Sequence, residues 1–113
     1  MKIKLNETPR VFTVGKDNKI EISDWGKIQL NFDEQITFVT ESDKQYDVVA
    51  KSWGFYATPS VNKRLKNEGF KTALVKNEHG NYYIMVVDKE KLEDFKAYLE
   101  GEKNKIQRWL DEL

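Results

Sequence analysis

Clusters of turn-forming residues recur every eight to ten residues in the first half of the chain, and this spacing limits what that half can fold into. The clusters are Gly15–Asn18, Ser23–Gly26, Asp33–Glu34 and Glu41–Lys44. Apolar and polar residues alternate between them, and a period of two is typical of half-buried strands. We therefore predict a β-meander with strands at 10–14, 19–22, 27–32, 35–40 and 45–57, and a short edge strand at Met1–Leu5.

The second half opens with helix signals. The pair Thr58–Pro59 suits a helix start. A threonine at the N-cap accepts a hydrogen bond from a first-turn amide. Proline fits the first helical position, because the backbone N–H that it lacks would have no partner within the helix. The predicted helix spans 59–68. Gly69 then takes the left-handed position after it, which makes Leu65 and Phe70 the pair that touch in a Schellman motif.

A hairpin and another helix should follow. Strands are predicted at 71–76 and 82–87, and the loop 77–81 between them is rich in residues that tolerate positive φ. Asp88 then caps a helix in which apolar residues recur at helical spacing. These apolar residues are Leu92, Phe95, Tyr98 and Leu99.

The C-terminal segment has two interpretations. Apolar residues continue to the end of the chain at intervals of three and four, with Glu102 the one polar member, which predicts a continuous amphipathic helix. Gly101 favours two helices or a kinked one, because glycine costs about 1 kcal/mol in a helix interior relative to alanine. We favour this second interpretation, with Ile106, Trp109 and Leu110 on the inner face of the last helix.

Length and composition predict a single globular domain over residues 1–113. The chain is 39% hydrophobic and 34% charged, which excludes collagen-like, low-complexity and wholly disordered classes. The expected fold class is α+β, an antiparallel β-sheet of five to seven strands with one mid-chain helix and a C-terminal helical segment packed on it. With no cysteine, no leader and no long apolar run, a cytoplasmic location is expected.

The zero net charge conceals a strong local bias. Residues 1–50 carry a net charge of −2, residues 51–77 carry +5 and residues 78–113 carry −3. The basic middle segment would attract an anion. The alternative is that the acidic flanks fold back against it and neutralise it.

The best candidate site is the segment from Trp53 to Ser60, in which three aromatic residues lead into the predicted helix start. Free amides and the helix dipole would favour a phosphate or carboxylate there, and an aromatic ring would stack on a sugar or base. The candidate ligand-binding residues are Trp53, Tyr56, Thr58, Ser60, Lys63, Arg64 and Lys71. The alternative is that Trp53 and Phe55 share one strand face and belong to the core.

The sequence argues against an enzyme. His79 is the only histidine and lies in the predicted hairpin loop, a poor position for a catalytic base and one with too few neighbours for zinc. Paired carboxylates are adjacent in sequence, and the six glycines are too scattered to form a phosphate-binding loop. We therefore assign no catalytic residue, no metal and no cofactor.

The segment W-G-F-Y-A-T-P-S-V-N-K-R-L from Trp53, the segment Gly69–Asn77 and the closing W-L-D-E from Trp109 together resemble a family of small uncharacterised bacterial proteins. The likeness spans about residues 35–112, and the first thirty or so residues lie outside it. The resemblance implies a bacterial source and a self-contained domain. It implies no activity.

The leading functional hypothesis is a non-catalytic accessory or binding module that recognises an anionic or sugar-containing small molecule, or a partner surface, through the 53–71 region. A second hypothesis is a structural or interaction protein that pairs through its C-terminal amphipathic helix. A nucleic-acid binder ranks third, because an isoelectric point near 6.6 lacks the usual basic footprint. No membrane partner is expected, and the sequence leaves the oligomeric state open.

Overall fold

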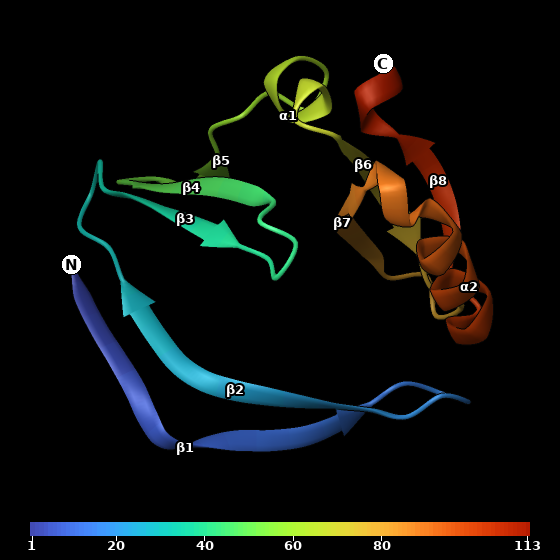
Figure 1. Ribbon diagram of the computed structural model, residues 1–113, viewed down its shortest axis with the longest axis horizontal. Helices are drawn as coiled ribbons and strands as arrows, with labels where there is room; N and C mark the ends of the chain where they lie inside the picture. Colours follow the sequence, from blue (N-terminus) through green and yellow to red (C-terminus); the bar gives the residue numbers. More distant parts are fainter. The chain divides into compact units, whose positions relative to one another are not determined.

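The computed structural model describes residues 1–113, and its helices and strands are labelled in Figure 1. The chain divides into two compact units. Unit 1 comprises residues 1–15 and 19–58, and unit 2 comprises residues 16–18 and 59–113. The secondary structure is mostly antiparallel β-sheet with one main helix near the C-terminus, which confirms the α+β class. The predicted single sheet of five to seven strands is wrong, because eight strands form three small sheets.

Unit 1 begins with a long β-hairpin, β1 (Lys2–Val14) and β2 (Ile20–Gln29). The predicted break at Ser23–Gly26 is wrong, because this cluster lies inside β2. The cluster bends the strand without ending it. Gly26 has a φ of 131° and lies so close to β1 that an added Cβ would meet the backbone of Lys4. Strand pairing shifts between Leu5 and Arg10, where Pro9 lacks a backbone donor.

The second sheet of unit 1 contains β3 (Gln35–Val39), β4 (Gln45–Lys51) and β5 (Gly54–Ala57) in that order. The strand predicted at 35–40 is confirmed. The strand predicted at 45–57 is split by a tight turn at Ser52–Trp53, because Lys51 pairs directly with Gly54. Gly54 has a φ of 142°, which residues with side chains rarely adopt, so the chain can reverse there.

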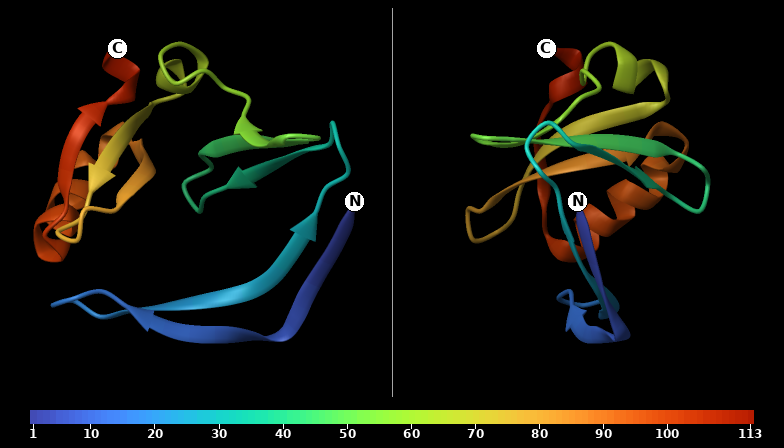
Figure 2. Two further views of the ribbon diagram at one scale, coloured as in Figure 1. Left: turned by 180° about the vertical axis from the view of Figure 1, so that it is seen from behind. Right: turned by 90° about the vertical axis from the view of Figure 1, so that its left-hand side faces the viewer.

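Unit 2 is a three-stranded sheet of β7 (Tyr82–Asp88), β6 (Phe70–Lys76) and β8 (Lys105–Trp109), with β6 in the centre. The helix α2 (Leu92–Glu102) lies against this sheet (Figure 2). The core between them contains Ala73, Val75 and Leu99, with Met85, Phe95, Ile106 and Trp109 packed around it.

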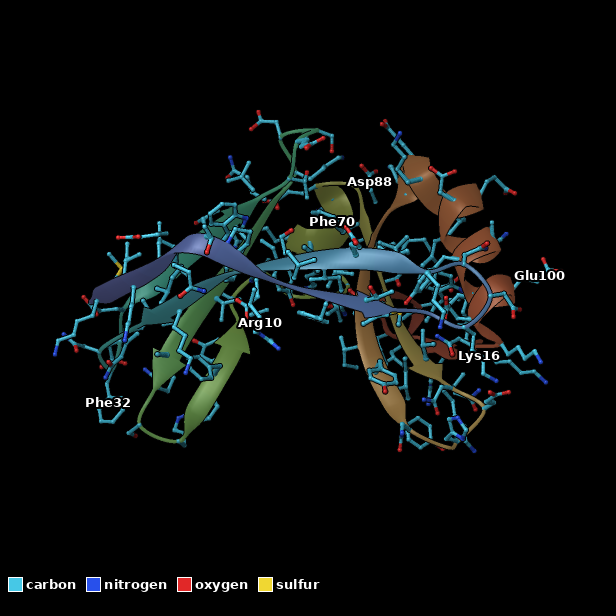
Figure 3. The ribbon with its side chains drawn as sticks, turned by 90° about the horizontal axis from the view of Figure 1, so that it is seen from below. Arg10, Lys16, Phe32, Phe70, Asp88 and Glu100 are labelled. Atoms are coloured by element: carbon cyan, nitrogen blue, oxygen red, sulfur yellow. The ribbon has the colours of Figure 1, made fainter.

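The predicted hairpin is confirmed, because β6 and β7 pair over their whole length. Phe70 and Asp88 are partners at its open end (Figure 3). At the closed end the Asn77 side chain accepts hydrogen bonds from the backbone amides of His79 and Asn81. The Asp88 carboxylate accepts from the Glu90 amide in the short 3-10 helix η1 (Lys89–Lys91) that leads into α2, so the predicted cap is also confirmed.

The helix predicted at 59–68 is wrong in length. The helix α1 contains only Arg64–Asn67, and Thr58 does not cap it. The Ser60 hydroxyl accepts from the Arg64 amide at 3.2 Å, so residues 58–63 lead into the helix as an irregular segment. The predicted end is confirmed. Gly69 has a φ of 95°, and its amide donates to the Lys66 carbonyl, one of the two Schellman hydrogen bonds.

Both interpretations of the C-terminal segment are wrong. The helix α2 runs through Gly101 to Glu102, and Lys103 follows it in the left-handed conformation with a φ of 58°. The chain then forms β8 and a short 3-10 helix, η2 (Leu110–Glu112). A register shift in β8 lets Ile106 face Val75 and Trp109 face Ala73, so two residues three apart point to the same side. A separation of three residues is also the spacing of apolar side chains on one face of a helix.

No helix in the chain is both long and apolar enough to cross a membrane.

Candidate functional site

The seven predicted binding residues divide between the two units. Trp53, Tyr56 and Thr58 belong to unit 1, whereas Ser60, Lys63, Arg64 and Lys71 belong to unit 2.

In unit 1 the turn between β4 and β5 places two aromatic rings together. Trp53 stacks on Tyr56 with ring centroids 5.6 Å apart and ring planes 14° from parallel. The Trp53 side chain is nevertheless 68% exposed, so much of the indole remains open to a ligand. Phe55 is 70% exposed and pairs with Ala50 on the opposite face of the sheet from Tyr56. The alternative that Trp53 and Phe55 form core is therefore wrong.

Polar side chains share the face of the sheet that carries Tyr56. The register places Gln35, Val49 and Tyr56 in one row across β3, β4 and β5. Thr58 follows Tyr56 at the strand period, and its hydroxyl donates to the Gln35 side-chain oxygen at 3.3 Å. This bond leaves the Gln35 amide NH2 group able to donate to a ligand.

Lys51 adds a charge beside the aromatic pair. Its ammonium forms an ion pair with Asp33, and the hydrogen bond that it donates to this carboxylate holds the pKa of Lys51 above its ordinary value of 10.5. The two charges of this ion pair balance each other. We call the group formed by Trp53, Tyr56, Gln35, Thr58 and Lys51 the Trp53 surface.

The anion-site prediction relied on a helix start at Thr58–Ser60, and the structure places no helix start there. The helix α1 has four residues, too few to present a substantial dipole, and Lys63 precedes it without a side-chain capping bond. Ser60 is engaged with the Arg64 amide, and the Arg64 guanidinium lies 4.0 Å from Glu68. These residues therefore serve the local turn.

Lys71 lies in an internal network of unit 2. Its ammonium donates to the Asp111 carboxylate at 2.9 Å and lies 4.5 Å from the centre of the Trp109 ring. The Asp111 side chain is fully buried and also accepts from the Thr72 backbone amide at 3.0 Å. Lys71 thus fastens the C-terminal η2 turn to β6.

His79 lies at the exposed tip of the β6–β7 hairpin, as predicted. Its Nε2 atom is 3.8 Å from a Glu78 carboxylate oxygen. The chain contains no group of three or more His, Cys, Asp and Glu side chains arranged to hold a metal ion.

Sequence reasoning did not find Gln35 or Lys51. Both come from strands distant in sequence from the Trp53–Ser60 segment, and only the β3–β4–β5 register brings them beside it. The basic bias of residues 51–77 includes Lys51 but does not distinguish it from the other lysines.

No protein-family model matches the chain, and no curated protein or solved structure is significantly similar to it. The family resemblance of the 53–60 segment therefore stays a prediction.

Proposed function

We propose that the chain is a non-catalytic binding module and that the Trp53 surface recognises a sugar-containing ligand. The observation that carries the proposal is the exposed indole of Trp53, whose ring orientation is fixed by stacking on Tyr56. An aromatic ring is costly to leave in water, and its conformational freedom is already restricted here, so ordering it on binding costs little.

The chemistry around the stack suits a carbohydrate. Sugar rings present apolar C–H faces that pack on aromatic rings, and their hydroxyl groups need directional hydrogen-bond partners. Gln35 supplies amide donors, Thr58 a hydroxyl and Lys51 an ammonium, all on the face that carries Tyr56. A few polar groups around an aromatic surface are typical of small-molecule recognition.

The charge of unit 1 favours a neutral sugar over a nucleic acid. The unit contains seven basic and eight acidic residues, so it lacks the positive surface that draws in phosphate backbones. Pairing through a C-terminal amphipathic helix has lost its basis, because residues 105–109 form a strand.

The test is a titration of the labelled chain with cellotriose, maltotriose and chitotriose, followed by NMR. We expect at least one trisaccharide to shift the Trp53 indole N–H signal saturably, and Trp53→Ala to abolish binding while the far-UV circular dichroism is unchanged. Phe55→Ala is the matched control, because it removes an equally exposed ring from the opposite face of the same strand. No saturable shift with any of the three sugars, or an equal loss of binding in Trp53→Ala and Phe55→Ala, would contradict the proposal.

A further inference from the structure

The strand β7 leaves one edge of the unit 2 sheet without a partner. The strand order is β7, β6, β8, so β7 has a neighbouring strand on one side only (Figure 1). It is seven residues long and pairs with β6 throughout without a register shift. A free edge presents a row of backbone N–H and C=O groups to which another strand can bind. We call this side of the strand the β7 edge.

Two hydrogen bonds at the ends of the hairpin show which backbone groups of β7 point outward. The Asn77 amide donates to the Asn81 carbonyl at one end, and the Lys89 amide donates to the Gly69 carbonyl at the other. Hydrogen-bonded pairs alternate with non-hydrogen-bonded pairs along an antiparallel ladder. Counted from either end, every even-numbered residue of β7 therefore directs its backbone N–H and C=O groups away from β6. Those within the apolar part of the strand are Tyr82, Ile84 and Val86.

The β7 edge has none of the features that keep sheet edges apart. Native sheets protect a free edge with charged side chains, proline or a bulge. Residues 82–87 contain no charged residue and no proline, and their pairing is regular. The other outer strand, β8, has a register shift and the charged side chains of Lys105 and Arg108. One edge of this sheet is therefore protected against pairing, and the β7 edge is open to it.

The side chains at the β7 edge are apolar and exposed on both faces of the sheet. Tyr83 and Met85 pair with core residues of β6 and lie on the face that packs against α2, and Tyr83 is 46% exposed. Tyr82 and Ile84 lie on the opposite face and are 56% and 59% exposed. A strand bound at this edge would remove apolar surface from water on each face, in addition to forming backbone hydrogen bonds.

We propose that the β7 edge binds the β7 edge of a second copy of this chain, as an antiparallel pair about a two-fold axis at Ile84. Ile84 then lies opposite the same residue of the second copy, and Tyr82 lies opposite its Val86. In this register all of the outward-directed residues form hydrogen-bonded pairs. The two three-stranded sheets of the copies become one continuous sheet. This inference is independent of the sugar proposal, because all of the residues that carry it belong to unit 2.

The positions of the charged and loop residues determine this register. A two-fold axis at Val86 would place the Asp88 carboxylate opposite Ile84, and an axis at Tyr82 would place Gly80 of the hairpin loop there. Only the axis at Ile84 pairs residues 82–86 with one another and leaves every charged side chain outside the pair. A two-fold interface requires a surface that is complementary to itself, and an uncharged apolar strand meets this requirement without a partner of different sequence.

The first test is made on the unmodified chain. Sedimentation equilibrium at protein concentrations up to about 1 mM should show a monomer that converts to a dimer, which detects a Kd of that order or lower. Amide hydrogen exchange followed by NMR tests the register. The amides of Tyr82, Ile84 and Val86 should exchange more slowly as the dimer forms, whereas those of Tyr83 and Met85 are already protected by β6 in the monomer.

The second test places a charge on the two-fold axis. Ile84→Lys should raise the Kd of the dimer at least about tenfold, because two ammonium groups would then meet, and the far-UV circular dichroism should be unchanged. Gln107→Lys is the matched control, since it adds the same charge at an exposed position of the opposite outer strand, β8. A chain that stays monomeric up to about 1 mM, a dimer without added protection at the three outward amides, or an equal effect of the two variants would overturn the proposal.

Discussion

Replacing Asp111 by alanine should strongly destabilise unit 2. The Asp111 carboxylate is fully buried and accepts from the Lys71 ammonium at 2.9 Å and the Thr72 amide at 3.0 Å. Alanine leaves the buried Thr72 amide without an acceptor, which costs about 1–3 kcal/mol. It also removes the partner of a largely desolvated ammonium.

The second part of the cost is smaller than for a fully buried pair. Breaking a buried salt bridge costs about 3–5 kcal/mol when the remaining charge has no other partner. The Lys71 side chain is 23% exposed and keeps Glu112 at 3.8 Å and the Trp109 ring at 4.5 Å, so its charge stays partly compensated. We therefore expect Asp111→Ala to lower the free energy of unfolding by about 2–4 kcal/mol in total.

Urea denaturation followed by circular dichroism measures this loss directly. The double-mutant cycle with Lys71→Met separates the ion pair from the Thr72 hydrogen bond, because only the first needs both side chains. Glu112→Ala is the control and should change the free energy of unfolding by less than about 0.5 kcal/mol, since its side chain is 55% exposed. A loss below about 1 kcal/mol for Asp111→Ala would refute the argument that this carboxylate fastens the C-terminus.

Two further predictions concern stability. Gly69→Ala should lower the free energy of unfolding by about 1 kcal/mol in urea denaturation, because Gly69 has a φ of 95°, and an unchanged midpoint would contradict this. Burial alone would raise the pKa of Asp111, but the hydrogen bonds from Lys71 and Thr72 hold it below its ordinary value of 3.8. The stabilisation from Asp111 should therefore be complete above the pKa of its carboxyl in the unfolded chain and should disappear as the pH falls through the pKa in the folded chain. The difference in urea midpoint between the unmodified chain and Asp111→Asn must then shrink in acid.

Local signals predicted the β6–β7 hairpin and the start of α2 correctly. The loop residue Asn77 and the cap residue Asp88 each satisfy backbone amides within four positions of themselves, so a short stretch of sequence contains both partners. Gly69 is similar, because the positive φ that it provides is required by the adjacent helix end. Such features depend little on the rest of the fold.

Elements whose partners are distant in sequence were predicted less well. The Ser23–Gly26 cluster looks like a turn, yet the chain continues as β2 because β1 provides a paired strand alongside it. The helix signal at Thr58–Pro59 likewise competes with the sheet, since the Thr58 amide donates to the Asp47 carbonyl and extends the β4–β5 pairing. Tertiary hydrogen bonding overrides local propensity in both cases.

The C-terminal strand shows how a periodicity can mislead. An extra residue in β8 changes the strand period of two into a separation of three between Ile106 and Trp109, and both side chains then reach the same core. The same two positions would share a face in a helix. The difference lies in the edge of β6, which offers unpaired backbone groups to the returning chain, and this edge exists only once the sheet has formed.

Two of the six basic residues in the segment 51–77 are neutralised by carboxylates outside that segment. Lys51 pairs with Asp33 and Lys71 with Asp111, which confirms for these two lysines that the acidic flanks fold back on the basic middle. Lys76 has no such partner and meets Lys105, which comes from the segment with a net charge of −3. A local excess of lysine in the sequence therefore does not mark an anion site here. The unpaired positive charge arises where the β6–β8 register brings lysines of two segments together, a juxtaposition that only the fold shows.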